Sequence, residues 1–253
     1  MIEVVPSSTR ARGIQLMVAT AAVNLALHLA GFHKLFADDA EGIGALLQIV
    51  GTLYSVVYAF ATYVIWGQFA AVENEILKES GALKDLILFS KALKENTRDP
   101  IVRAVRAYAR AVTESEWGNL SRGDTNERTD KLFITIIASV TDAKPEDDAE
   151  RRAHEHLLQI ANLASAHRDE RLALSAKRMP KTLLLFVTLT ASTILFLLMF
   201  FPFHNLALGL VAVALTVMLL FFAHFVLTDL DNPFEGTWNV DSTPFADLAA
   251  KYH

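Results

Sequence analysis

Residues 206–234, LALGLVAVALTVMLLFFAHFVLTDLDNPF, decide the fold of this chain. Residues 206–228 contain no Asp, Glu, Lys or Arg, and a run of about 18 or more apolar residues is long enough to cross a bilayer as a helix. An acidic pair and the sequence Asn232-Pro233-Phe234 follow. Because Asn initiates turns and Pro fixes its own φ angle, the stretch predicts a membrane helix that ends at a turn.

Three other segments of the 253-residue chain are almost free of charge: residues 13–36, 42–72 and 182–203. The last two contain no Asp, Glu, Lys or Arg. The first segment contains one Lys and four other polar interruptions, namely Gln15, Asn24, His28 and His33. The sequence therefore predicts an all-α protein with four transmembrane helices. Since the first segment exceeds the roughly 7–15 apolar residues of a signal peptide, we expect it to be retained.

The basic residues are concentrated in the middle of the chain. Of the 23 Lys and Arg residues, 19 lie between residues 74 and 181, and positive residues favour the cytoplasmic side of a membrane. We therefore expect both termini and the central block to be cytoplasmic. The predicted order is a cytoplasmic N-terminus (1–12), transmembrane helices 1 and 2 (13–72), a cytoplasmic helical domain (73–181), transmembrane helices 3 and 4 (182–228) and a cytoplasmic tail (229–253).

The central block has helical apolar spacing throughout. This spacing continues the second span as a helix to residue 94, and Pro100 is expected to mark the start of a new helix, because Pro fits best in a first turn. Further helices are predicted at residues 101–117, at residues 131–140 and from residue 145 to residue 177.

Composition excludes several classes of function. The 19 basic residues of the central block are balanced by 18 acidic residues, so no nucleic-acid surface is expected. Without any Cys, the chain has no disulfide, thiolate metal site or thiol catalyst. The signatures of zinc proteases, phosphate-binding loops, nucleophile elbows and dinucleotide-binding turns are missing from the sequence. We therefore expect no enzyme activity.

The second span carries a stripe of polar and small side chains. Its members recur at alternating steps of four and three residues, which places them on one face of a helix. Polar groups in lipid are costly unless they face protein or water. The stripe therefore predicts either a pore-lining face or a helix–helix contact, where small and hydroxyl residues are also enriched. Its residues are Gln48, Thr52, Ser55, Ala59, Thr62 and Trp66.

Other polar side chains fall within the spans and in the tail. Thr20, Asn24 and His28 are four residues apart in the first span, and such groups relay protons or hydrogen-bond across helices. The oxygen-rich tail suits calcium, or a turn whose acids are simply solvated. No cofactor is expected, and calcium is the one ion with a candidate site in the sequence. The residues of that candidate site are Asp229, Asp231, Asn232, Glu235 and Asp241.

Four segments carry a resemblance to a known family: residues 59–82, 108–123, 166–180 and 229–245. They include the sequences Tyr-Ala-Arg-Ala-Val, Ala-His-Arg-Asp-Glu-Arg-Leu and Asp-Leu-Asp-Asn-Pro-Phe-Glu-Gly. Their order resembles the bestrophin-like membrane proteins of bacteria and plants, and more distantly the bestrophins, which are oligomeric anion channels. The resemblance implies an integral protein of the bacterial inner membrane, in contact with the lipid bilayer.

The resemblance to bestrophins implies a homo-oligomer, with a pentamer favoured, that conducts small inorganic ions. The second span would line the pore, with Ile49, Leu53 and Val57 near an apolar constriction. Anion selectivity is implied, but three acids against Lys34 in the predicted outer loop favour cations, so a cation channel is an alternative. The other alternative is a non-conducting scaffold or sensor with a partner-binding cytoplasmic domain. The dense acidic run that follows Asn-Pro-Phe in bestrophins is missing here.

Overall fold

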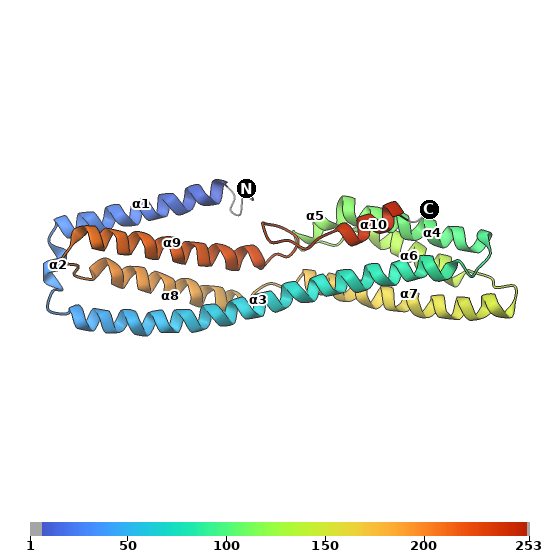
Figure 1. Ribbon diagram of the computed structural model, residues 1–253, viewed down its shortest axis with the longest axis horizontal. Helices are drawn as coiled ribbons and strands as arrows, with labels where there is room; N and C mark the ends of the chain where they lie inside the picture. Colours follow the sequence, from blue (N-terminus) through green and yellow to red (C-terminus); the bar gives the residue numbers. More distant parts are fainter. Residues whose placement is uncertain (1–6, 252–253) are drawn as a thin grey trace. The chain divides into compact units, whose positions relative to one another are not determined.

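The structure is a computed structural model that describes residues 7–251. Every regular element among these residues is a helix (Figure 1), so the all-α class is confirmed. The chain forms two compact units. Unit 1 comprises the described part of Met1–Trp66 together with Met179–Asp231, and unit 2 comprises Gly67–Arg178 with the described part of Asn232–His253. Residues 1–6 of the predicted N-terminal segment and 252–253 of the tail lie outside the described residues.

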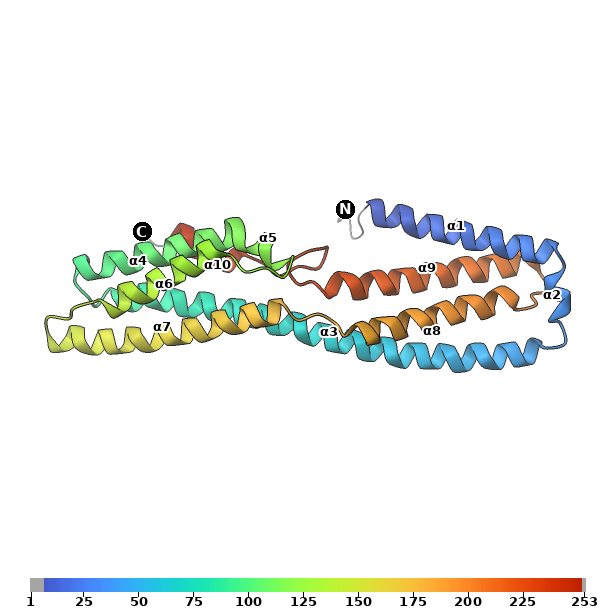
Figure 2. The same ribbon diagram turned by 180° about the vertical axis from the view of Figure 1, so that it is seen from behind.

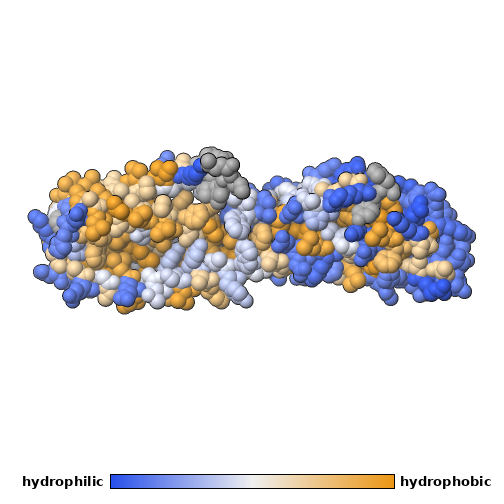
Figure 3. Space-filling model, viewed as in Figure 1, coloured by the Kyte–Doolittle hydropathy of each residue, from blue (hydrophilic) through white to orange (hydrophobic). Residues whose placement is uncertain are grey.

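Unit 1 consists of long apolar helices. In chain order these are α1 (Ser7–Leu29), the short α2 (Phe32–Leu35), the first part of α3 (Ala40–Ser90), α8 (Lys181–Phe200) and α9 (Leu206–Leu230). α9 packs against α1 and against α8 (Figure 1, Figure 2). Figure 3 shows hydrophobic residues over most of the visible face of these helices. Helices that are apolar on all sides are typical of a lipid environment.

Three helices are long and apolar enough to cross a membrane, namely α3, α8 and α9. α8 has 20 residues, and at about 1.5 Å per residue it matches the roughly 30 Å hydrocarbon core of a bilayer. α1 is not among the three, because Arg10 and Arg12 lie in its first turns and polar groups interrupt the rest. Three of the four expected membrane helices are thus supported by length and composition, and the fourth stays a prediction.

α3 is one continuous helix of 51 residues. It contains no Pro, and residues 42–72 carry no charge, so nothing in this stretch interrupts the helix. The prediction that the second span continues as a helix into the central block is confirmed. Residues 40–66 of α3 belong to unit 1, and residues 67–90 belong to unit 2.

Unit 2 packs several shorter helices around the second part of α3. These are α4 (Glu95–Ala111), the π-helical turn η1 (Val112–Glu116), α5 (Trp117–Leu120), α6 (Glu127–Thr141), α7 (Asp148–Ser175) and α10 (Thr243–Lys251). α4 packs against both α6 and α10. Their apolar sides form one core that includes the fully buried Leu83, Val105, Ile136, Leu157 and Phe245. At about 1.5–3 kcal/mol for each buried large apolar side chain, unit 2 has a substantial core of its own.

Side-chain caps explain where three helices begin. The Asp147 carboxylate accepts the backbone N–H of Glu150 at 2.8 Å at the start of α7. The side chains of Asn126 and Asn205 cap α6 and α9 in the same way. Such a cap satisfies a backbone donor that has no partner within the helix and contributes about 1 kcal/mol.

Two expectations for the central block are wrong. The break after the second span lies at residues 91–94, and α4 begins at Glu95, so Pro100 lies inside this helix rather than at its start. Pro100 falls in the second turn, where the missing N–H removes a single hydrogen bond. The helix expected at residues 101–117 is interrupted by η1. α10 in the tail was not predicted at all.

Candidate functional site

All nine predicted pore-lining residues lie on the part of α3 that belongs to unit 1. At about 100° per residue, this part presents three faces. The first face packs within the chain: Ala61 and Ile65 are fully buried, and the Tyr58 hydroxyl donates to the Ala223 carbonyl of α9 at 3.3 Å. Of the nine predicted residues, only the half-buried Val57 lies at the edge of this packed face.

The second face is the polar stripe, and it is largely uncovered in the single chain. Gln48, Thr52, Ser55 and Ala59 are exposed, Thr62 is half-buried, and Trp66 is exposed. The hydroxyls of Thr52, Ser55 and Thr62 donate to carbonyls four residues earlier, at 2.8, 2.8 and 2.9 Å. These hydroxyl hydrogens are therefore bonded within the helix, which lowers the free-energy cost of placing the hydroxyl groups in an apolar environment.

Gln48 differs from the hydroxyl residues of the stripe. Its side-chain amide bonds to no other residue within the described part of the chain. It lies eight residues, or about 12 Å, from the start of α3. An unpaired amide in hydrocarbon costs several kcal/mol, so Gln48 requires water or another protein chain beside it.

The third face is apolar and also uncovered. Ile49 and Leu53, which the sequence placed near a constriction, are 63% and 43% exposed. They continue into Val56, Phe60 and Tyr63, which are 60% exposed or more and were not predicted as site residues. The signal was present in the sequence, because these five positions also recur at steps of four and three. The polar stripe and this apolar face are therefore neighbours, and both are available to a partner.

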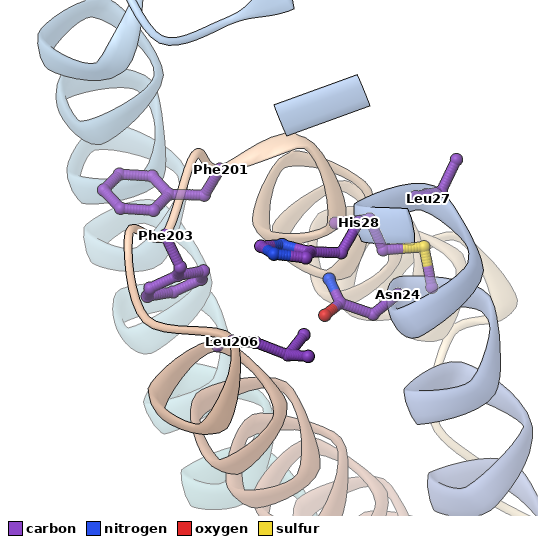
Figure 4. Close-up of a pocket in the computed structure, with 8 residues that line it drawn as sticks. Asn24, Leu27, His28, Phe201, Phe203 and Leu206 are labelled. Carbon is purple, nitrogen blue, oxygen red and sulfur yellow. The ribbon is translucent and has the colours of Figure 1, made fainter. Parts of the chain in front are cut away.

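A small cavity lies in unit 1 beside the loop between α8 and α9 (Figure 4). Asn24 and His28 project toward it from α1, and Phe201 and Phe203 lie across from them (Figure 4). Its volume is about 10 Å³, which is close to the space that one water occupies. Asn24 and Thr20 are each only 7% exposed. The Thr20 hydroxyl donates to the Leu16 carbonyl of its own helix at 2.8 Å, and both interpretations of this series, helix contact and proton path, stay predictions.

The Asn-Pro-Phe turn is fastened to the rest of the protein by its polar side chains. Asp231 accepts the backbone N–H of Met179 at 2.5 Å. The Asn232 amide donates to the Ser121 carbonyl at 2.8 Å, and its oxygen accepts from Arg178 at 3.2 Å. The Glu235 carboxylate accepts from the same amide at 3.3 Å. Asn232 thus joins the tail to the ends of α5 and α7.

Asp241 has a different partner. Its carboxylate accepts both the backbone N–H and the hydroxyl of Thr243, at 2.8 and 2.6 Å, at the start of α10. These two bonds, the hydroxyl bond being the larger cause, hold the pKa of Asp241 below its usual value of 3.8. Asp229 lies in the last turn of α9. Within residues 7–251 no group of three or more His, Asp and Glu side chains could hold a metal ion, and the calcium site stays a prediction.

An ionic cluster that the sequence did not predict lies in the core of unit 2. Arg171 of α7 is fully buried between two fully buried acids. Its Nε donates to Glu79 of α3 at 2.6 Å, and its Nη2 lies 2.7 Å from Glu116 of η1. The Tyr108 hydroxyl of α4 also donates to Glu79, at 2.6 Å. One guanidinium therefore connects three helical segments.

The cluster extends through a second arginine. Arg168, one turn before Arg171, donates to the Tyr108 hydroxyl at 3.1 Å and to Asp130 of α6 at 2.5 Å. Burial alone would lower the pKa of Arg171, but the charges of Glu79 and Glu116 outweigh it and hold that pKa well above its usual value. Burial, followed by the charge of Glu79, raises the pKa of Tyr108. Tyr108 is consequently a neutral donor within the cluster.

The comparisons with known proteins agree with this architecture. The family described as the Bestrophin-like domain matches residues 15–245. No curated protein matches the chain. Among solved structures, the chain is similar to a mutant of a bacterial bestrophin homologue from Klebsiella pneumoniae. The TM-score is 0.69 at 11% sequence identity, over 92% of this chain and 97% of that one.

The structural likeness, at that low identity, concerns the fold. It confirms that the helices are arranged as in a bestrophin homologue. The family match covers most of the chain, because it runs from α1 to the start of α10. The chain therefore belongs to the bestrophin-like family.

Proposed function

We propose that the protein is a homo-oligomeric ion channel in which residues 40–66 of α3 from each subunit line a central pore. Its family has ion channels among its members. The observation that carries the proposal is the uncovered state of this segment. None of the residues in the most apolar 18-residue stretch of α3 is buried. The segment nevertheless carries the polar stripe, including Gln48, whose side-chain amide has no bond partner among the described residues.

A lipid surface does not account for this segment by itself. The apolar face with Val56 and Phe60 is suited to lipid, to a neighbouring subunit or to an apolar constriction that gates by dewetting. The polar stripe is suited to water or to a neighbouring subunit. Several copies of α3 around one axis satisfy both faces at once. The pentamer and the anion selectivity in this proposal come from the resemblance to bestrophins.

The proposed topology follows from charge. α1, α3, α8 and α9 cross the membrane, and unit 2 together with both termini lies in the cytoplasm, where positive residues are favoured. α1 serves as the fourth membrane helix: it packs against α9, and its polar residues Thr20 and Asn24 are buried. We place the protein in the bacterial inner membrane. Calcium control through Asp229, Asp231 and Glu235 stays a prediction, and any calcium there would compete with the Met179 N–H for the Asp231 carboxylate.

The chain offers an unusually clean test, because it contains no Cys. Single Cys residues are introduced on each face of α3: Ser55→Cys on the stripe, Phe60→Cys on the apolar face and Ala61→Cys on the packed face. The purified variants are placed in bilayers, and small charged thiol reagents are added while current is recorded. The face that lines the pore loses or changes current on modification, and Ala61→Cys does not respond. If no uncovered position responds while current flows, α3 does not line the pore.

The same experiment reports on selectivity. A negatively charged reagent that modifies a pore position faster than a positively charged one of similar size indicates an anion-selective path. The opposite order of rates keeps the channel and discards the anion assignment. Labelling of the same variants in detergent, where the reagents reach all exposed positions, separates a blocked path from an unreactive thiol.

A further inference from the structure

A groove in unit 2 has a charge that contrasts with the rest of the chain. It has a volume of about 620 Å³ and lies where the end of α3, the outer side of α4 and the end of α10 meet. Five cationic side chains and two acidic ones line it, although the whole chain carries a net charge of −5. The cations are Lys91, Arg98, Arg103, Arg106 and Lys251.

Two of these cations are already neutralised by acids. Arg98 bonds to Asp99 at 3.1 Å and lies 3.9 Å from Glu95. Lys251 bonds to Asp247 at 2.6 Å, one turn earlier in α10. These pairs are local to their own helices, and they account for both acidic residues that line the groove.

The other three cations have no such partner. Lys91, Arg103 and Arg106 form no ion pair with any carboxylate among residues 7–251. Arg103 and Arg106 are three residues apart on α4, so their charges are neighbours on the helix surface and repel each other. The Nε of Arg106 donates to the Ala249 carbonyl of α10 at 3.3 Å. This bond fixes the guanidinium in place and leaves its two terminal amino groups for a ligand.

We propose that this groove binds a phosphate-bearing anion with several negative charges. Guanidinium groups present parallel N–H donors that match the oxygens of phosphate. The volume exceeds the needs of a single halide and is in the range of small-molecule sites. An anion between Arg103 and Arg106 removes their mutual repulsion. The site is separate from the proposed pore positions on α3, and the inference does not depend on ion conduction.

Inorganic tripolyphosphate is the probe for the first arm of the test. It is titrated into the full-length protein in detergent at constant ionic strength, and binding is measured by calorimetry. The variant Arg103→Gln/Arg106→Gln removes two charge-assisted contacts and is expected to weaken binding by about 10-fold or more. The control Arg122→Gln/Lys177→Gln removes the same charge from exposed positions outside the groove, and its affinity is expected to stay within about 2-fold of the parent.

A second arm distinguishes a soluble ligand from a lipid headgroup. Short-chain phosphatidic acid, which carries the same phosphate chemistry on a lipid, is titrated under the same conditions. Loss of its binding in the groove variant but not in the control assigns the phosphate to a lipid. Binding of tripolyphosphate alone assigns it to a soluble anion. The proposal is overturned if the parent binds neither probe, or if both variants weaken binding equally.

Folding of the variants is verified before binding is compared. Arg103 is exposed and Arg106 is half-buried, so the thermal midpoint of the groove variant without ligand is expected to match the parent. If it does not, Lys91→Gln/Arg103→Gln, which changes two exposed cations only, replaces it with the same expected loss of affinity. Unchanged binding in that variant also overturns the proposal.

Discussion

The two parts of α3 differ in what surrounds them, although they belong to one unbroken helix. In residues 40–66 only Ala61 and Ile65 are buried. In residues 67–90 the helix buries an apolar series that includes Val72, Ile76 and Leu83, and it also buries the charged Glu79. The second part has its packing partners within the subunit. The first part has few, and its partners must be lipid, water or further copies of the chain.

The same comparison applies to polar groups. In the second part, Glu79 is fully buried and its oxygens bond to Arg171 and Tyr108. In the first part, the Thr52 and Ser55 hydroxyls bond to their own helix, and the Gln48 side chain has no bond partner among the described residues. Buried polar groups in a folded unit are paired almost without exception. The difference shows that unit 2 supplies partners for most of its buried polar side chains, with unbonded atoms only at Glu116 and Arg171 among the described residues, whereas the stripe on α3 lies uncovered in the single chain.

The largest effect is expected from breaking the ionic cluster. Arg171→Met leaves Glu79 and Glu116 as buried acids without their cation, and removal of one partner from a buried ion pair costs about 3–5 kcal/mol. The free energy of unfolding in detergent is measured by denaturant titration. Lys177→Met, at an exposed position two residues after Arg171's helix ends, is the control and is expected to change it by less than about 0.5 kcal/mol. Equal losses of unfolding free energy in the two variants would show that the ionic cluster does not stabilise unit 2.

Asn232→Ala is expected to have the next largest effect on stability. It removes the bonds to the Ser121 carbonyl and to Arg178, both between half-buried groups. At about 0.5–1.5 kcal/mol for each bond, the loss should cost about 1–3 kcal/mol. The matched control is Asn239→Ala in the same tail, where the exposed side chain makes one bond to Gly236. Hydrogen exchange of the tail should increase for the first variant and not for the second. A tail that stays protected in Asn232→Ala contradicts the role of Asn232 in joining the tail to the ends of α5 and α7.

A fixed charge on the polar stripe tests what surrounds the first part of α3. Ser55→Lys should raise anion permeability relative to cations, and Ser55→Glu should lower it, each by roughly an order of magnitude if the site faces a narrow pore. Reversal potentials in asymmetric salt give the ratio, and gel filtration verifies assembly. Variants that assemble and conduct like the parent would show that the stripe does not line the pore.

The smallest effect concerns the cap of α10. Asp241→Ala should cost about 1 kcal/mol, because it removes the acceptor for the first turn of the helix. The pKa of Asp241 is lower in the folded protein than its usual 3.8, so its contribution is fully present above that value and is lost as the pH falls through the lowered pKa. The stability difference between parent and variant should therefore shrink in strong acid. A difference that does not change with pH argues against the ionised cap.

Sequence patterns predicted the long apolar helices, missed α10 and the boundaries of α4, and gave no information on the contacts between helices. The uncharged stretch of residues 42–72 and the Asn-Pro-Phe sequence predicted a long helix and a turn, since both depend on local chemistry. Glu79, Glu116 and Arg171 looked like ordinary charged positions on helices. Their pairing joins residues up to 92 positions apart, and no local pattern records it. The π-helical turn that precedes Trp117 is equally invisible to a search for 3.6-residue periodicity.

The candidate pore residues were placed by periodicity alone, and this limited what could be inferred. Steps of four and three placed Gln48, Thr52 and Ser55 on one face, as the structure does. They did not distinguish the apolar face with Phe60 from the packed face with Ala61, because both consist of apolar or small residues. The burial of Ala61 and Ile65 and the contact of Tyr58 with α9 separate the two faces.

The most direct test of the channel proposal is ion flux from liposomes that contain the purified protein, with chloride and potassium gradients measured separately. The account predicts chloride flux that a charged substitution at Ser55 changes. Potassium flux without chloride flux would keep the pore and contradict its anion selectivity. No flux of either ion from a folded oligomer would contradict the channel itself and favour the non-conducting scaffold or sensor.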